Sequence, residues 1–232
     1  VFKYNPATHA VTELDIPSGA SYDSAFSVYF TPDGQRLLAS VNNTSGELNS
    51  YTFLSGQLAR VTTNNVDGST QAIPVCLAVT QNLSHIAYAY DAGLRYYAYS
   101  HASIRSGSAL SVPALSLGTG GAATGVVFSP DGQLLVCAGR GQVAALERSG
   151  NALSLIGYLP APSYARSTIP GYYSGLAFSP DGSLLAHATT AEQGTVAVYR
   201  RRGTTFTRLS APPGLPAGAL CRDIAFPRIP LA

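Results

Sequence analysis

Hydrophobic and polar positions along the chain follow a repeat of about 49 residues. Three times, a short apolar segment ends at a phenylalanine, a polar Thr/Ser-Pro-Asp-Gly turn follows, and a second apolar segment begins. These copies occupy residues 30–34, 128–132 and 178–182. Phe30 and Phe128 lie 98 residues apart, which is two repeats, so the spacing predicts another copy near position 79.

Two weaker copies complete the series. Residues 75–84 keep the apolar approach and the polar turn but have lost Pro, Asp and Gly, and residues 223–227 form a fifth copy. Five copies at one spacing predict one supersecondary unit repeated along a single domain, 1–232. The last apolar residue of each first strand marks its unit: Phe30, Val79, Phe128, Phe178 and Phe226.

The polar turn has a structural reason for its composition. Pro presets φ at a turn corner, Asp accepts hydrogen bonds from its own turn, and Gly tolerates positive φ. The aspartates Asp33, Asp131 and Asp181 share one place in this turn, so we interpret them as turn residues and not as a catalytic set.

Each unit contains four predicted strands. Apolar residues stand on both faces of the first two, which indicates sheets covered on both sides. A third strand often ends at an aromatic residue, as at 196–199, and a hairpin leads to a fourth, as at 205–209. Four antiparallel strands per 49-residue unit predict an all-β fold, a β-propeller.

The phase of the repeat predicts how the ring closes. Residues 1–4 match the third strand at 196–199, and residues 11–14 match the fourth strand, whereas the C-terminal segment matches a first strand. Joining the two ends in one shared blade would give five blades and leave no open sheet edge. The alternative is that the chain is a piece of a longer propeller.

The composition mainly excludes certain partners and bonds: nucleic acid, a membrane span and disulfides. Charged residues make up only 11% of the chain and the net charge is +2, so we expect no nucleic-acid partner. No apolar segment is long enough to span a membrane, so we expect no membrane insertion. The cysteines Cys76, Cys137 and Cys221 each lie in or beside an apolar strand of a different unit, which favours buried thiols over disulfides.

A catalytic site is not evident at the positions where propellers hold ligands. Three residues before each marker, near the central axis, the units carry Ser27, Cys76, Gly125, Gly175 and Asp223. One carboxylate does not make a metal cage, which needs several converging ligands. His187 lies within a second strand and is interpreted as a packed residue. We therefore expect no catalytic residue, no metal, no cofactor and no enzyme activity.

Tyrosine is the one compositional feature that suggests binding, because the chain has 14 tyrosines and no tryptophan. Exposed rings with polar tips can stack on sugars or anchor protein partners. Tyr158, Tyr164 and Tyr172 stand in predicted loops, and Tyr96 belongs to a cluster at 88–99 that also fits cross-strand pairing. These four are the candidate binding residues.

Residues 175–188, 196–199, 206–209 and 215–218 resemble the WD40-like repeat proteins found among bacteriophage and prophage virion genes. The resemblance implies a non-enzymatic virion protein of the tail or particle surface, which docks to other virion proteins or to a host surface carbohydrate. The Ser-Pro-Asp-Gly turn also occurs in lactonase-type and bacterial WD40-like propellers. A lactonase-like hydrolase and a bacterial interaction scaffold therefore remain alternatives.

Overall fold

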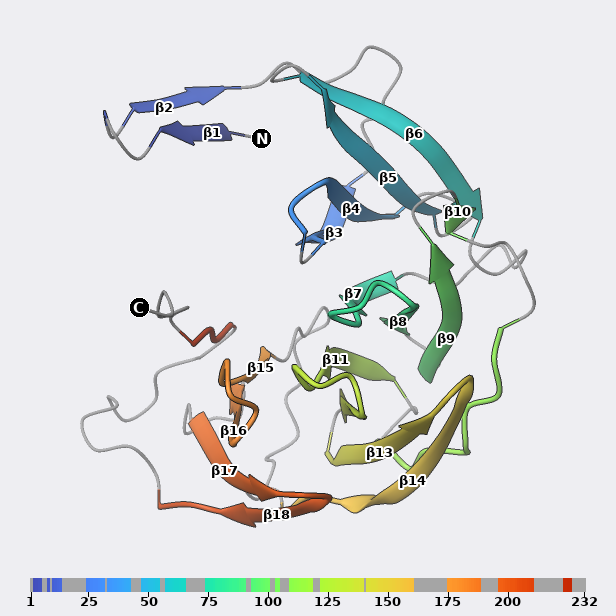
Figure 1. Ribbon diagram of the computed structural model, residues 1–232. Coiled ribbons are helices and arrows are strands. Elements are labelled where there is room, and N and C mark those ends of the chain that lie inside the picture. The colour runs from blue at the N-terminus through green and yellow to red at the C-terminus, as the bar shows by residue number, and fades with distance from the viewer. Residues whose placement is uncertain are drawn as a thin grey trace.

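A computed structural model describes the parts of the chain that form strands and the turns between many of them (Figure 1). The described residues are 2–5, 8, 10–13, 24–31, 33–42, 47–54, 57–65, 74–90, 93–100, 103–104, 109–118, 122–139, 141–160, 175–188, 196–210 and 223–226. Within these ranges the regular elements are β-strands, and no helix long and apolar enough to cross a membrane occurs.

Four four-stranded antiparallel sheets account for most of the fold, each with its strands in chain order. The first contains β3 (Ser24–Phe30), β4 (Arg36–Asn42), β5 (Glu47–Leu54) and β6 (Gln57–Asn65); the second β7 (Pro74–Val79), β8 (His85–Tyr90), β9 (Gly93–Ser100) and β10 (Ser103–Ile104); the third β11 (Ala123–Phe128), β12 (Leu134–Gly139), β13 (Val143–Ser149) and β14 (Ala152–Tyr158); and the fourth β15 (Leu176–Phe178), β16 (Leu184–Ala188), β17 (Val196–Arg202) and β18 (Thr205–Arg208). The predicted unit of four strands is therefore present four times.

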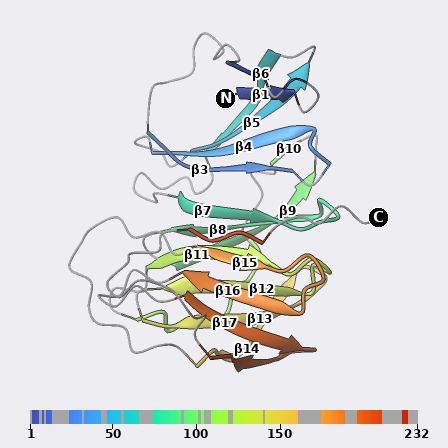
Figure 2. The same ribbon diagram turned by 90° about the vertical axis from the view of Figure 1, so that its left-hand side faces the viewer.

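The sheets are arranged around a common centre. Figure 1 shows the first strand of each sheet, β3, β7, β11 and β15, toward the middle and the later strands toward the periphery. Successive first strands contact one another, and the view turned by 90° shows the sheets following one another as layers (Figure 2). The arrangement is that of an all-β, propeller-like fold, as predicted.

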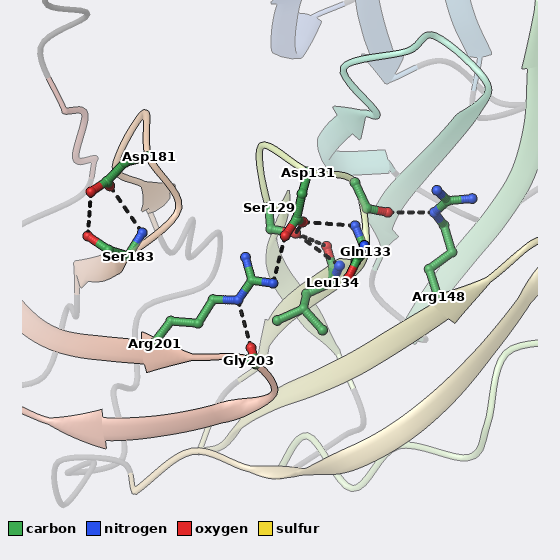
Figure 3. A network of polar contacts seen from close by, with 10 residues as sticks. Ser129, Asp131, Gln133, Leu134, Arg148, Asp181, Ser183, Arg201 and Gly203 are labelled. Atoms are coloured by element: carbon green, nitrogen blue, oxygen red, sulfur yellow. Dashed lines mark hydrogen bonds and ion pairs between the residues drawn. The ribbon is translucent and has the colours of Figure 1, made fainter.

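The turn between the first and second strand is built as its composition predicts. In the third sheet the amide of Gly132 donates to Ser129 O at 2.8 Å, and Gly132 has a φ of +67°. The hydroxyl of Ser129 donates to Asp131, whose carboxylate also accepts from the amide of Gln133 (Figure 3). The conspicuous aspartate is a turn residue.

The core consists of apolar clusters between neighbouring sheets. Leu38 of β4 shares one cluster with Ile86 of β8, and Tyr96 of β9 packs against Phe128 of β11 with ring centroids 6.4 Å apart. A third cluster includes Val136 of β12 and Tyr199 of β17. Burying a large apolar side chain contributes roughly 1.5–3 kcal/mol, so these clusters hold the sheets face to face.

The predicted closing blade is not observed in the described residues. β1 (Phe2–Asn5) and β2 (Ala10–Glu13) pair with each other in a separate two-stranded sheet, and residues 223–226 are not assigned to a strand. Figure 1 shows the hairpin and the C-terminal segment at separate places on the same side of the ring. The count of five blades therefore stays a prediction.

Candidate functional site

Three of the predicted axial positions make contacts with neighbouring segments: Cys76, Gly175 and Asp223. Cys76 in β7 lies against the neighbouring β11, where its Sγ is 3.8 Å from Val126 O. Gly175 lies directly before β15 and packs against Asp223: a Cβ added to Gly175 would stand 2.6 Å from Asp223 Cα. Because such a distance is sterically forbidden, glycine is required there for the C-terminal segment to approach β15 so closely.

This contact places Asp223 and Ile224 beside Gly175, the residue directly before β15. The side chain of Asp223 is exposed, and its Oδ1 accepts a hydrogen bond from the amide of Ile224 at 2.8 Å. An exposed carboxylate therefore stands next to the residue that precedes β15.

Cys76 is a poor nucleophile in this setting. Burial raises the pKa of its thiol, and the negative charge of Asp223 raises it further. The thiol is therefore protonated at neutral pH, whereas nucleophilic cysteines act as thiolates.

A cavity of about 270 Å³ opens at one end of the second sheet. Tyr90 at this end pairs with Pro74 of β7 on one side and with Gly93 of β9 on the other. The Arg95 guanidinium lies over the Tyr90 ring, 5.1 Å from its centroid, and the rest of the wall includes Leu94, Leu110, Val112, Leu115 and Leu117. This volume is slightly below the roughly 300–1,000 Å³ that is typical of small-molecule sites.

The described residues contain no group of three or more His, Cys, Asp or Glu side chains placed to hold a metal ion. Cys76 and Cys137 are free thiols, as the strand positions predict, and Cys221 lies outside the described residues. His187 is completely buried in β16, in agreement with its interpretation as a packed residue.

The candidate binding tyrosines have different surroundings. Tyr158 is the last residue of strand β14 and not part of a loop as predicted; it is 38% exposed, and its hydroxyl oxygen accepts a hydrogen bond from the amide of Ser116 at 2.7 Å. Tyr96 is completely buried: its ring stacks on His85, and its hydroxyl donates to Gly150 O. Its position in the sheet leaves no face of the ring for a ligand. Tyr164 and Tyr172 lie outside the described residues.

No family model and no curated protein matches the sequence. Solved structures do share the fold. Among them are a candidate 6-phosphogluconolactonase from Bacteroides uniformis (13% identity, TM-score 0.67), a second from Bacteroides fragilis (16%, 0.60) and a protein of unknown function from Desulfotomaculum acetoxidans (19%, 0.63). These matches cover 90%, 90% and 87% of this chain, and 63%, 62% and 58% of the respective neighbours. The chain thus spans about three fifths of their length.

This finding contradicts two expectations from the sequence. We expected a virion structural protein and no enzyme activity, but two of these neighbours are candidate lactone hydrolases, and none of the three is a phage protein. The reason for the error is that the Ser-Pro-Asp-Gly turn stabilises a strand hairpin, so it identifies the fold without identifying the role. The resemblance to WD40-like repeats and the predicted virion partners are not tested by these matches.

Proposed function

We propose that this chain belongs to a lactone-hydrolysing propeller and that Asp223 acts as the general base of the reaction. The observation that carries the proposal is the backbone contact of Asp223 with Gly175, directly before β15, together with the place of β15 toward the middle of the fold (Figure 1). The fold shared with two candidate 6-phosphogluconolactonases supports it, because in propellers the axial ends of the first strands are a common place for ligands.

The chemistry requires one group that removes a proton. The carboxylate of Asp223 takes a proton from a water molecule while the water oxygen forms a bond to the lactone carbonyl carbon. The bond between that carbon and the ring oxygen then breaks, and the ring oxygen takes up the proton. The product is the open-chain sugar acid, and the carboxylate is regenerated.

A fifth unit is part of this proposal. Asp223 and Ile224 lie beside Gly175, directly before β15, which supports a first strand of a further blade at this place. We further propose that the N-terminal hairpin supplies the third and fourth strands of that blade. This arrangement predicts that removing the hairpin also weakens the attachment of the Asp223 segment.

The test is acid release from glucono-1,5-lactone and from its 6-phosphate, followed with a pH indicator in weak buffer. We expect the chain to accelerate ring opening, and Asp223→Asn to lower kcat/KM by roughly 100-fold, the usual contribution of a positioned base. Glu147→Gln is the matched control, because Glu147 is an exposed carboxylate in β13 outside the axial region. No acceleration by the folded wild-type chain, or equal rates for wild type and Asp223→Asn, would overturn the proposal.

A further inference from the structure

The turn of the second sheet differs from the other turns in ways that its structural role does not require. Here Thr80-Gln81-Asn82-Leu83 replaces the Ser-Pro-Asp-Gly pattern, Ser84 follows it, and His85 stands where the third and fourth sheets have Leu134 and Leu184. The backbone has nevertheless kept the shape of the turn: the amide of Thr80 donates to His85 O at 3.0 Å, as that of Ser129 does to Leu134 O at 2.9 Å.

Keeping that shape without glycine is unfavourable. Leu83 has a φ of +58°, whereas the corresponding positions in the other three sheets are Gly34, Gly132 and Gly182. A left-handed conformation costs a non-glycine residue roughly 1–2 kcal/mol. Backbone strain of this kind is concentrated at functional sites, which makes this turn a candidate site.

The side chains of this turn form a hydrogen-bonded relay that crosses to the third sheet. The hydroxyl of Ser84 lies 2.7 Å from Nδ1 of His85, and Nε2 of the same ring lies 2.9 Å from Oδ1 of Asn151. An amide oxygen can only accept, so Nε2 carries the proton and Nδ1 presents its lone pair to the serine hydroxyl. The order is nucleophile, base and orienting group, as in hydrolases that act through a covalent intermediate.

The surroundings keep the His85 imidazole neutral and fix the plane of its ring. The ring stacks on Tyr96 with centroids 5.1 Å apart and an interplanar angle of 14°, which fixes its plane. Burial lowers the pKa of His85, and the nearby charge of Arg148 lowers it further, against the opposing effect of the hydrogen bond that His85 donates to Asn151. The histidine is therefore neutral at pH 7 and able to accept a proton.

Arg148 adds a positive charge beside the reacting groups. Its Nε donates to Gly132 O at 2.6 Å and its Nη1 to Gly150 O at 3.1 Å, and Nη1 lies 3.4 Å from Nδ1 of His85. Because the two carbonyls belong to the third sheet, the guanidinium is fixed from that side of the interface. A fixed cation at this place would stabilise negative charge that develops on a carbonyl oxygen.

Asn82 distinguishes this serine from its counterpart in the fourth sheet. Ser183 occupies the same turn position, and its hydroxyl donates to the charged carboxylate of Asp181 at 2.7 Å (Figure 3). The Ser84 hydroxyl instead donates to the neutral Oδ1 of Asn82 at 2.6 Å. A neutral amide is a weaker acceptor than a carboxylate, so the proton of Ser84 is easier to give to His85.

We propose that Ser84, His85, Asn151 and Arg148 form a second site, separate from Asp223, that cleaves small carboxylic esters through an acyl-serine intermediate. Ser84 Oγ forms a bond to the ester carbonyl carbon as His85 takes the hydroxyl proton. The bond from that carbon to the alkoxy oxygen breaks, and His85 gives the proton to the departing alcohol. Water, with His85 as base, then releases the acid and restores the serine. Ser84 is half-buried and lies beyond the end of β7 opposite to Cys76, so it does not share the axial site.

Labelling with diisopropyl fluorophosphate tests the proposal. The reagent forms an Oγ–P bond and releases fluoride with the serine proton, and mass spectrometry locates the modified residue. We expect modification of Ser84, loss of the label in Ser84→Ala, and full labelling in Ser183→Ala, the control that shares the turn position but has no histidine after it. His85→Leu introduces the residue found at 134 and 184, so the fold is expected to tolerate it, and it should slow labelling by roughly 100-fold.

A second variant keeps the test decisive if His85→Leu fails to fold. Asn82→Asp restores the carboxylate of the other turns. It should slow labelling of Ser84, because the Ser84 hydroxyl would then donate to a charged carboxylate, as the Ser183 hydroxyl donates to Asp181. Release of 4-nitrophenol from 4-nitrophenyl acetate should follow the same order of variants. An unlabelled Ser84 in folded wild-type chain, equal labelling of Ser183, or an unchanged rate in either Asn82→Asp or folded His85→Leu would each overturn the proposal. Because labelling does not require lactone turnover, the result is independent of the function proposed for Asp223.

Discussion

His187 gives a prediction for the pH dependence of stability. It lies in β16 between Leu176 of β15 and Ala197 of β17, and its side chain is completely buried. Burial lowers its pKa from 6.5 to about 4. In the unfolded chain the imidazole returns to its ordinary pKa, so the two states bind different numbers of protons between about pH 6.5 and pH 4.

The sign and size of the effect follow from this difference. As the pH falls through 6.5 the unfolded chain takes up a proton that the folded protein does not, and the free energy of unfolding decreases. The decrease ends near pH 4, where the folded protein also takes up the proton. With 1.36 kcal/mol for each pKa unit, the loss amounts to about 3 kcal/mol.

Urea titrations followed by circular dichroism, at pH 7 and near pH 4, would measure this loss. We expect the wild-type chain to lose about 3 kcal/mol more over this interval than His187→Leu, in which the volume is largely kept and the titration removed. His85→Leu serves as the comparison, because the pKa of His85 is also lowered by burial and its titration overlaps the same interval. Equal pH dependence in wild type and His187→Leu would refute the reasoning.

Two further predictions concern the contacts between sheets. Gly175→Ala should destabilise the chain by about 1–3 kcal/mol and displace Asp223, because the added methyl group would stand 2.6 Å from Asp223 Cα; a denaturant midpoint equal to that of wild type would contradict it. Arg201 of β17 is paired with Asp131 of the third sheet at 2.8 Å (Figure 3). Because the carboxylate is 42% exposed, Arg201→Ala should cost less than about 1 kcal/mol, and the effect should shrink further in 1 M salt.

The sequence predicts the parts of this fold that depend on local chemistry. Pro, Asp and Gly in one turn, followed by apolar pairs, determine a hairpin wherever they occur, and the turn around Asp131 has the expected hydrogen bonds. The spacing of the copies then predicts four strands in each unit. The weak copy near Val79 is a strand hairpin of the same shape although its turn has no glycine, because the side-chain oxygen of Thr80 still accepts from the amide of His85.

Contacts between sheets are harder to predict from sequence. Tyr96 looks like a candidate surface tyrosine because tyrosine is common on both sides of it, yet the neighbouring sheet covers it. In a fold whose sheets are covered on both faces, alternation of apolar and polar residues no longer distinguishes a buried side chain from an exposed one. Tyr158, at the outer edge of the third sheet, is exposed as expected.

The candidate ester site illustrates the same limit more sharply. The His85 ring is within hydrogen-bond distance of Ser84, its neighbour in sequence. Its other polar partners, Arg148 and Asn151, are 63 and 66 residues away along the chain. No short motif contains these residues, since they meet only when the second and third sheets pack together. From the sequence alone the missing Pro-Asp-Gly in the second unit is interpreted as decay of the repeat. In the structure the same substitutions provide a neutral acceptor, a nucleophile and a base at one turn, and a strained Leu83 is retained beside them. A turn that had only lost its pattern would be expected to relax into a conformation that leucine accepts readily, so the retained strain favours function over decay.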